Sequence, residues 1–207
     1  MTVDFKMGGS ITRRAIGWTM FLLLFSTPAL AQFFSRQEVS HTSYDLYLDS
    51  FRSVASQASG AGPLTLDLVR EWTEKANDIP YNHVEPYRFR SPEEVEASGY
   101  GDCKDKALWL YSKLSAAGAR HIQLVIGRKD TQAGEFHAWL YLTFCGRTYL
   151  LDPTISGSIS EASDYSADEY VPVYAYDRSG AYAYATEGDG STLAINYQMA
   201  VPRIAGH

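Results

Sequence analysis

The sequence predicts an α+β protein in which a group of helices packs on an antiparallel sheet. Apolar residues recur at helical spacing between positions 44 and 117, and alternating strand patterns begin at His121. Helical segments followed by a run of strands are typical of the α+β class. The chain has 207 residues, which is enough for one domain with a well-formed core.

Four helices are expected before the sheet. The first covers residues 44–54 and ends at the Gly- and Pro-containing segment 59–63. The second runs over about 64–77. Residues 91–94 read Ser-Pro-Glu-Glu, a capping box with proline at the first helical position, and predict a short helix over 92–97.

The central helix is expected to begin at Cys103. Asp102 is a natural N-cap residue, Gly99 and Gly101 bracket the preceding turn, and Gly118 ends the helix. The buried stripe of this helix is predicted to consist of Ala107, Leu110, Tyr111, Leu114 and Ala117.

The strand patterns predict two hairpins. Residues 121–127 form a first strand, and 136–142 pairs with 147–151. Beyond residue 154 the chain becomes tyrosine-rich and acidic, and residues 173–176 and 181–185 flank a good hairpin turn. We expect this second hairpin to add an edge to the same sheet, in preference to forming a separate binding module. Four tyrosines are expected to line one face of it: Tyr174, Tyr176, Tyr182 and Tyr184.

Three residues have the types and positions of a nucleophile, its base and an orienting acid. Cys103 begins a helix, His137 lies in a strand, and Asp152 closes the next strand. The helix N-terminus favours negative charge on the thiol, and a nearby imidazole would accept its proton. Asp152 would fix the tautomer of His137 and stabilise the imidazolium. The Cys103 backbone N–H could stabilise an oxyanion, with Tyr81 or Asn82 as the candidate for a second donor.

This interpretation constrains the first hairpin and the cysteines. For Asp152 to face His137, residue 142 must pair with 147, which leaves a four-residue loop with Cys145 at its tip. Cys145 then lies roughly 26 Å from His137 along the strand, at about 3.3 Å per residue. A thiol that contacts His137 is therefore too far away to form a disulfide with Cys145. We expect Cys103 to be a free nucleophile and Cys145 to be an inert structural residue.

The first 31 residues have the features of an export signal. Arg13 and Arg14 precede an almost wholly apolar stretch over 15–25, and Ala29 and Ala31 are the small residues that a signal peptidase reads. The apolar stretch is too short to span a membrane. We expect cleavage after Ala31, no remaining membrane anchor, and a periplasmic or secreted protein.

The mature chain is expected to be a single domain over residues 32–207. Its core would cover about 64–155, with a Tyr-rich acidic β extension over 156–207. The formal net charge of the whole chain is −6, which argues against nucleic acid or an anionic membrane as the partner.

The segments around the three candidate residues resemble the transglutaminase-like superfamily, whose core is similar to papain-type cysteine proteases. They read Gly-Asp-Cys-Lys-Asp-Lys-Ala at 101–107, His-Ala-Trp at 137–139 and Leu-Asp-Pro-Thr at 151–154. Residues 77–81 and 91–103 are similar to the bacterial transglutaminase-like cysteine proteinases.

The resemblance covers about residues 64–155 and implies a fold and a set of roles. The fold would be papain-like, with the nucleophile at the N-terminus of a central helix packed on an antiparallel sheet. By this likeness Cys103 is the nucleophile, His137 the base and Asp152 the orienting acid.

Lys104 departs from the pattern of this family. Some of the bacterial proteinases have Asp-Cys-Glu-Asp here and use acidic residues around the cysteine for calcium. An ammonium in place of that glutamate is a poor neighbour for a divalent cation, so we expect no cofactor, although Asp102 and Asp105 remain. Arg88 and Arg90, which precede the capping box, are expected to be solvated.

The expected function is cysteine-dependent acyl transfer outside the cytoplasm. Water as the acceptor would make the protein a peptidase or amidase, and a primary amine would make it a transglutaminase. The small size, single domain and export signal favour hydrolysis of a protein or peptide, by analogy with the bacterial proteinases. A catalytically silent binding protein that keeps only the groove is the alternative from a different class.

Overall fold

The computed structural model describes residues 34–57, 59–129, 136–155, 159–166 and 168–186. The expected export signal and the last residues of the C-terminal extension lie outside the described residues. No helix within those ranges is long and apolar enough to cross a membrane.

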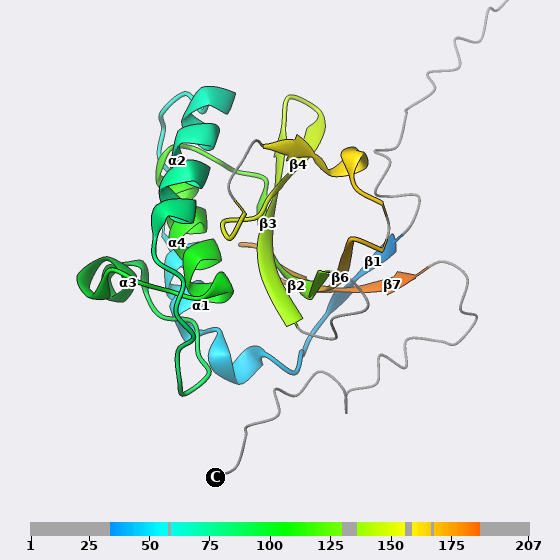
Figure 1. Cartoon of the computed structure of the whole chain (residues 1–207). Coiled ribbons are helices and arrows are strands. Elements are labelled where there is room, and N and C mark those ends of the chain that lie inside the picture. Colours follow the sequence, from blue (N-terminus) through cyan, green and yellow to red (C-terminus); the bar gives the residue numbers. More distant parts are fainter. Residues whose placement is uncertain (1–33, 58, 130–135, 156–158, 167, 187–207) are drawn as a thin grey trace, which may run out of the picture.

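The described helices gather on one side of the sheet (Figure 1). They are α1 (Asp49–Ser56), α2 (Leu66–Asp78), α3 (Pro92–Ser98) and α4 (Cys103–Ala116), with a short 3-10 turn, η2 (Asp45–Tyr47), before α1. Another 3-10 turn, η3 (Ala162–Asp164), comes late in the chain and lies outside this group of helices. Helix α4 packs against each of the other three helices and against the sheet. The main apolar core lies between α4 and the sheet.

The sheet has seven strands in the order β1-β7-β6-β2-β3-β4-β5. The strands are β1 (Phe34–Val39), β2 (Ile122–Lys129), β3 (Phe136–Phe144), β4 (Arg147–Leu151), β5 (Ser160–Glu161), β6 (Tyr170–Tyr176) and β7 (Ala181–Thr186). All neighbouring strands pair antiparallel. A second apolar cluster that includes Trp139 and Tyr141 covers the other face, so β2 and β3 are buried on both sides.

The helix start signals are confirmed. The Ser91 hydroxyl accepts from the Glu94 N–H, and Glu94 accepts from the Ser91 N–H, as a capping box requires. Asp102 accepts from the Asp105 N–H and caps α4. The first half of α4 is buried on nearly all sides, and not only along the one stripe that was predicted. The reason is that the other helices cover the sides of α4 that do not face the sheet.

The expected first helix is divided in two. Thr42 donates its backbone N–H and its hydroxyl to the Asp45 carboxylate, which stabilises a local turn at η2. Leu48 then leaves the helical region, with ψ at 13°, and α1 begins only at Asp49. The hydrogen bonds between Thr42 and Asp45 therefore stabilise a separate turn in place of the first part of the helix that the apolar spacing predicted.

The register predicted for the first hairpin was wrong. Leu142 pairs with Tyr149 and Phe144 with Arg147, which leaves a two-residue turn at Cys145 and Gly146. Both turn residues have positive φ, 50° and 77°, as a type I′ hairpin turn requires. Cys145 lies at the tip, as expected, but it is exposed and does not pack as a structural residue.

This register places Asp152 one position beyond the Leu140–Leu151 pair, opposite Trp139. His137 and Trp139 share one face of the strand, so Asp152 and His137 are diagonal neighbours. Such neighbours lie about 7–8 Å apart, within reach of long side chains. The two residues therefore meet without the longer loop.

The second hairpin joins the same sheet, as expected, but β6 lies inside it next to β2 and β7 pairs with β1. Tyr174 pairs with Ala183 and Ala175 with Tyr182. The expectation that four tyrosines share one face was therefore wrong. Tyr174 and Tyr176 face the main core, whereas Tyr184 packs in the second cluster on the other face.

Candidate active site

Cys103 is the first residue of α4, where its position is set by the Asp102 cap. The Asp102 carboxylate accepts from the Asp105 N–H at 3.3 Å, so the helix begins at a fixed point. The thiol is free and half-buried. It lines a cavity of about 430 Å³ together with His137, which leaves it open to a substrate.

His137 lies at the start of β3 and contacts both of the other candidate residues. Its Nε2 lies 2.9 Å from Asp152 Oδ2. The ring lines the same cavity as Cys103, and its interaction with the thiol contributes to the raised pKa of His137. The ring stacks on Trp139, with centroids 6.1 Å apart and an angle of 25° between the planes. The structure therefore brings together all three residues that the sequence singled out.

Asp152 is a buried carboxylate that accepts hydrogen bonds at both oxygens. Oδ1 accepts from the backbone N–H and hydroxyl of Thr154, at 2.9 and 2.7 Å. Besides His137, Oδ2 accepts from Lys129 Nζ at 3.1 Å and from the Tyr170 hydroxyl at 2.8 Å. A buried charge is costly without such partners, and here both oxygens have them.

The electrostatics of the pair favour an imidazolium beside a carboxylate. Burial lowers the pKa of His137, but hydrogen bonds to Asp152 and Cys103 outweigh it and raise that pKa to about 9. Burial raises the pKa of Asp152, but its bonds with His137 and Thr154 hold that pKa well below its ordinary value. The pair of charges therefore favours a protonated His137 at neutral pH.

Sequence reasoning missed three of the residues that support Asp152. Thr154 could have been found, because an aspartate that accepts from the residue two positions on is a common turn motif. Lys129 and Tyr170 could not, since they meet only through the pairing of β2 with β6, in which they stand directly opposite each other.

The wall of the cavity beside Cys103 is rich in aromatic rings. Tyr81 contributes to it, whereas Asn82 does not; the Asn82 backbone N–H instead donates to the Gly101 carbonyl at 3.2 Å. The aromatic members are Tyr44, Tyr47, Tyr81, Tyr87 and Phe136. A larger cavity of about 550 Å³ elsewhere includes none of the three candidate residues.

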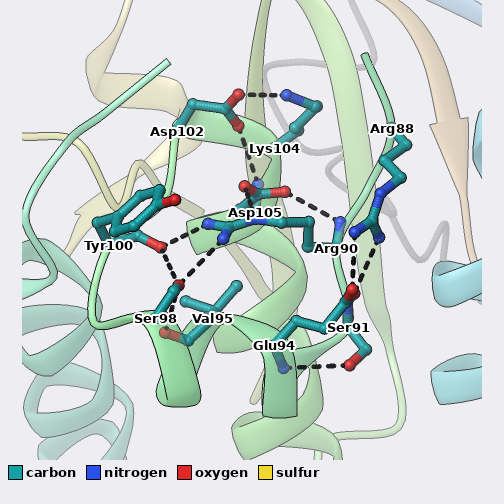
Figure 2. A network of polar contacts seen from close by, with 10 residues as sticks. All are labelled: Arg88, Arg90, Ser91, Glu94, Val95, Ser98, Tyr100, Asp102, Lys104 and Asp105. Carbon is teal, nitrogen blue, oxygen red and sulfur yellow. Dashed lines mark hydrogen bonds and ion pairs between the residues drawn. The ribbon is translucent and has the colours of Figure 1, made fainter. Parts of the chain in front are cut away.

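A buried group of charged side chains lies directly under the start of α4 (Figure 2). Arg90 is buried and bonds Asp105, so the expectation that it is solvated was wrong. Arg88 is partly exposed and pairs with Glu94 in two bonds of 2.9 and 2.7 Å. Among the described residues, no cluster of three or more His, Cys, Asp or Glu side chains is arranged to hold a metal ion.

Three solved structures of LapG from Legionella pneumophila resemble this chain. The calcium-bound form is 21% identical with a TM-score of 0.51, over 77% of this chain and 87% of that chain. The EGTA-treated form is 20% identical with a TM-score of 0.51, over 68% and 75%. A further LapG structure is 21% identical with a TM-score of 0.50, over 68% and 77%.

The chain has the fold of LapG. This likeness in fold confirms the expected α+β class, with helices packed on an antiparallel sheet. No protein-family model matches the sequence, and no curated protein matches it.

Proposed function

We propose that this protein is a cysteine peptidase or amidase in which Cys103 is the nucleophile, His137 the base and Asp152 the orienting acid. The observation that carries the proposal is that His137 bonds Asp152 at 2.9 Å and lines one cavity with Cys103, whose thiol helps to raise the pKa of the ring. A nucleophile bonded to a base, which is itself oriented by a third group, is the arrangement that covalent catalysis needs. The shared fold with LapG supports the peptidase class.

The proposed reaction has two halves. In the first, the Cys103 sulfur bonds to the carbonyl carbon of an amide, the C–N bond breaks, and the His137 imidazolium gives its proton to the departing amine. This leaves a thioester on Cys103 and a neutral imidazole. In the second, His137 takes a proton from water, the hydroxide adds to the thioester carbonyl, and the acid leaves as the thiol anion re-forms.

Water is the proposed acceptor, and an exported protein or peptide is the proposed substrate. The supporting observations are the LapG-like fold and the signal-like first 31 residues. A primary amine in place of water would make the same thioester end in an isopeptide link. Asp152 holds the imidazole for either acceptor, so the acceptor must be identified from the products.

Mass spectrometry of periplasmic proteins incubated with the enzyme tests this proposal. Wild type is expected to create new peptide termini, Cys103→Ala none, and Cys145→Asn the same termini as wild type. New isopeptide links would show transamidation in place of hydrolysis. An enzymatic role would be contradicted if neither product forms and Cys103 also fails to react with an electrophilic peptide.

A further inference from the structure

Four charged side chains are buried together where the nucleophile's helix begins (Figure 2). The exposed fractions of these residues are 2% for Asp102, 3% for Lys104, 0% for Asp105 and 5% for Arg90. Two carboxylates and two cations balance in charge. Because water hardly reaches them, these charges are not screened as surface charges would be.

Each carboxylate has a cation of its own. Arg90 donates to Asp105 through its backbone N–H at 3.0 Å and through Nε at 2.8 Å. The rest of its guanidinium binds the Ser98 hydroxyl at 3.0 Å and the Tyr100 carbonyl. Arg90 thus connects the end of α3 to the first turn of α4.

Lys104 is the cation next to the nucleophile. Its ammonium donates to Asp102 Oδ2 and lies 4.7 Å from the centroid of the Tyr87 ring. Lys104 also lines the cavity that holds Cys103. The residue therefore joins the N-cap of α4 to the aromatic wall of the cavity.

This arrangement does not fit a calcium ion, although LapG has a calcium-bound form. Calcium takes six to eight oxygen ligands, whereas Asp102 and Asp105 already bond Lys104 and Arg90. A second positive charge beside these cations would be repelled, and a displaced ammonium would be buried without its partner.

We propose that Lys104 is a positioning residue: its ammonium is the built-in cation that neutralises Asp102 beside Cys103, so the site works without a divalent metal ion. The proposal depends on the proposed role of Cys103 as nucleophile. An uncompensated carboxylate next to a thiol disfavours the thiolate. The positive charge of Lys104 offsets the repulsion between the Asp102 carboxylate and the thiolate, and Asp102 can still cap the helix.

The imidazole of His137, the ammonium of Lys106 and two nearby phenols do not replace Lys104. His137 is committed to Asp152, and Lys106 donates to the Asn77 carbonyl at 3.0 Å. Burial raises the pKa of both Tyr44 and Tyr87 far above neutrality, so these phenols stay uncharged.

The test measures the rate at which iodoacetamide labels Cys103 as a function of pH, in chains that carry Cys145→Asn. In Lys104→Met, the pH at which the labelling rate is half-maximal is expected to rise by about one unit. At any pH well below this midpoint, the variant should therefore be labelled about tenfold more slowly than the parent. Removing both charges, in Asp102→Asn with Lys104→Met, should restore the original profile, because an asparagine still caps the helix.

Lys113→Met is the matched control. Lys113 lies on the same helix and makes the same two kinds of contact. Its ammonium pairs with Glu96 at 2.6 Å and lies 5.1 Å from the centroid of the Trp109 ring. It is remote from the cavity and should leave the profile unchanged. Excess EGTA or added calcium should change neither the labelling rate nor the melting temperature of the wild type.

An unchanged profile in Lys104→Met would overturn the inference. So would a double variant that is as slow as the single one, or a wild type that EGTA slows. If Lys104→Met does not fold, the labelling profile of the folded double variant and the effect of EGTA on the wild type still test the role of Lys104. Labelling needs no substrate, so a failure to find peptidase products leaves this test intact.

Discussion

Asp152 is the residue whose charge determines the state of the whole site. It is 7% exposed, yet it holds a negative charge because Thr154, Lys129 and Tyr170 donate to it along with His137. The sequence could identify Asp152 through the Asp-Pro-Thr motif. It could not reveal Lys129 and Tyr170 as partners, because they reach Asp152 only when distant strands pair.

The first prediction concerns the proton on His137. Replacing Asp152 with asparagine removes the negative charge that holds the imidazolium, while burial of the ring remains and favours the neutral form. The pKa of His137 should fall from about 9 to near or below its ordinary value of 6.5. NMR titration of the His137 ring measures it, with Asp67→Asn, an exposed acid on α2, as the control. A pKa that stays near 9 in Asp152→Asn would show that Asp152 does not hold the proton.

The second prediction is a pH dependence of stability. The pKa of His137 is raised from 6.5 to about 9 on folding, so the folded state binds more protons between these values. The contribution of His137 to the free energy of unfolding is complete below about pH 6.5 and is lost as pH rises through about 9.

Urea unfolding of wild type and His137→Gln at about pH 6 and about pH 10 measures this contribution. The stability advantage of the wild type should shrink by on the order of 3 kcal/mol between the two conditions. A difference that is the same at both pH values would contradict a protonated His137 in the folded protein.

Among the secondary-structure elements, the helix of the nucleophile was the easiest to predict. Asp102, Cys103 and Gly118 mark its start and its end by local chemistry, and the structure agrees. The first hairpin was harder, because its register was derived from an assumed face-to-face contact of His137 with Asp152. The positive φ of Cys145 and Gly146 set a two-residue turn instead.

The third prediction concerns the close approach of β2 and β6. A Cβ atom added to Gly127 would lie 2.2 Å from the Val171 carbonyl oxygen and 2.5 Å from the Trp139 ring. Gly127→Ala should therefore destabilise the protein by about 1–3 kcal/mol, as overpacking does. Because the Trp139 ring also stacks on His137, iodoacetamide should label Cys103 more slowly at neutral pH in this variant.

Thermal and urea unfolding of Gly127→Ala measures the destabilisation. Gly180→Ala is the control, because a Cβ atom there meets only a flexible Glu38 oxygen at 3.5 Å. Equal stability of the two variants would mean that the strands are not so closely packed at Gly127.

At the scale of the whole molecule, the order of the elements predicted the α+β class, and the LapG structures confirm that fold. The sequence did not predict that β6 lies in the middle of the sheet, next to β2. Strand order is set by long-range pairing, and no local pattern encodes it. Nor did it predict the burial of Arg90, whose partner Asp105 lies fifteen residues further along the chain.

The most direct test of the central claim is the pH dependence of iodoacetamide labelling at Cys103, compared between the parent chain and His137→Ala. Cys145→Asn provides a suitable parent, because it leaves Cys103 as the only thiol and puts an asparagine, which tolerates positive φ, into the hairpin turn. We expect the parent rate to show an inflection well below about pH 8, and His137→Ala to lose it. A rate that rises only above about pH 8, and is the same without the imidazole, would contradict an activated nucleophile.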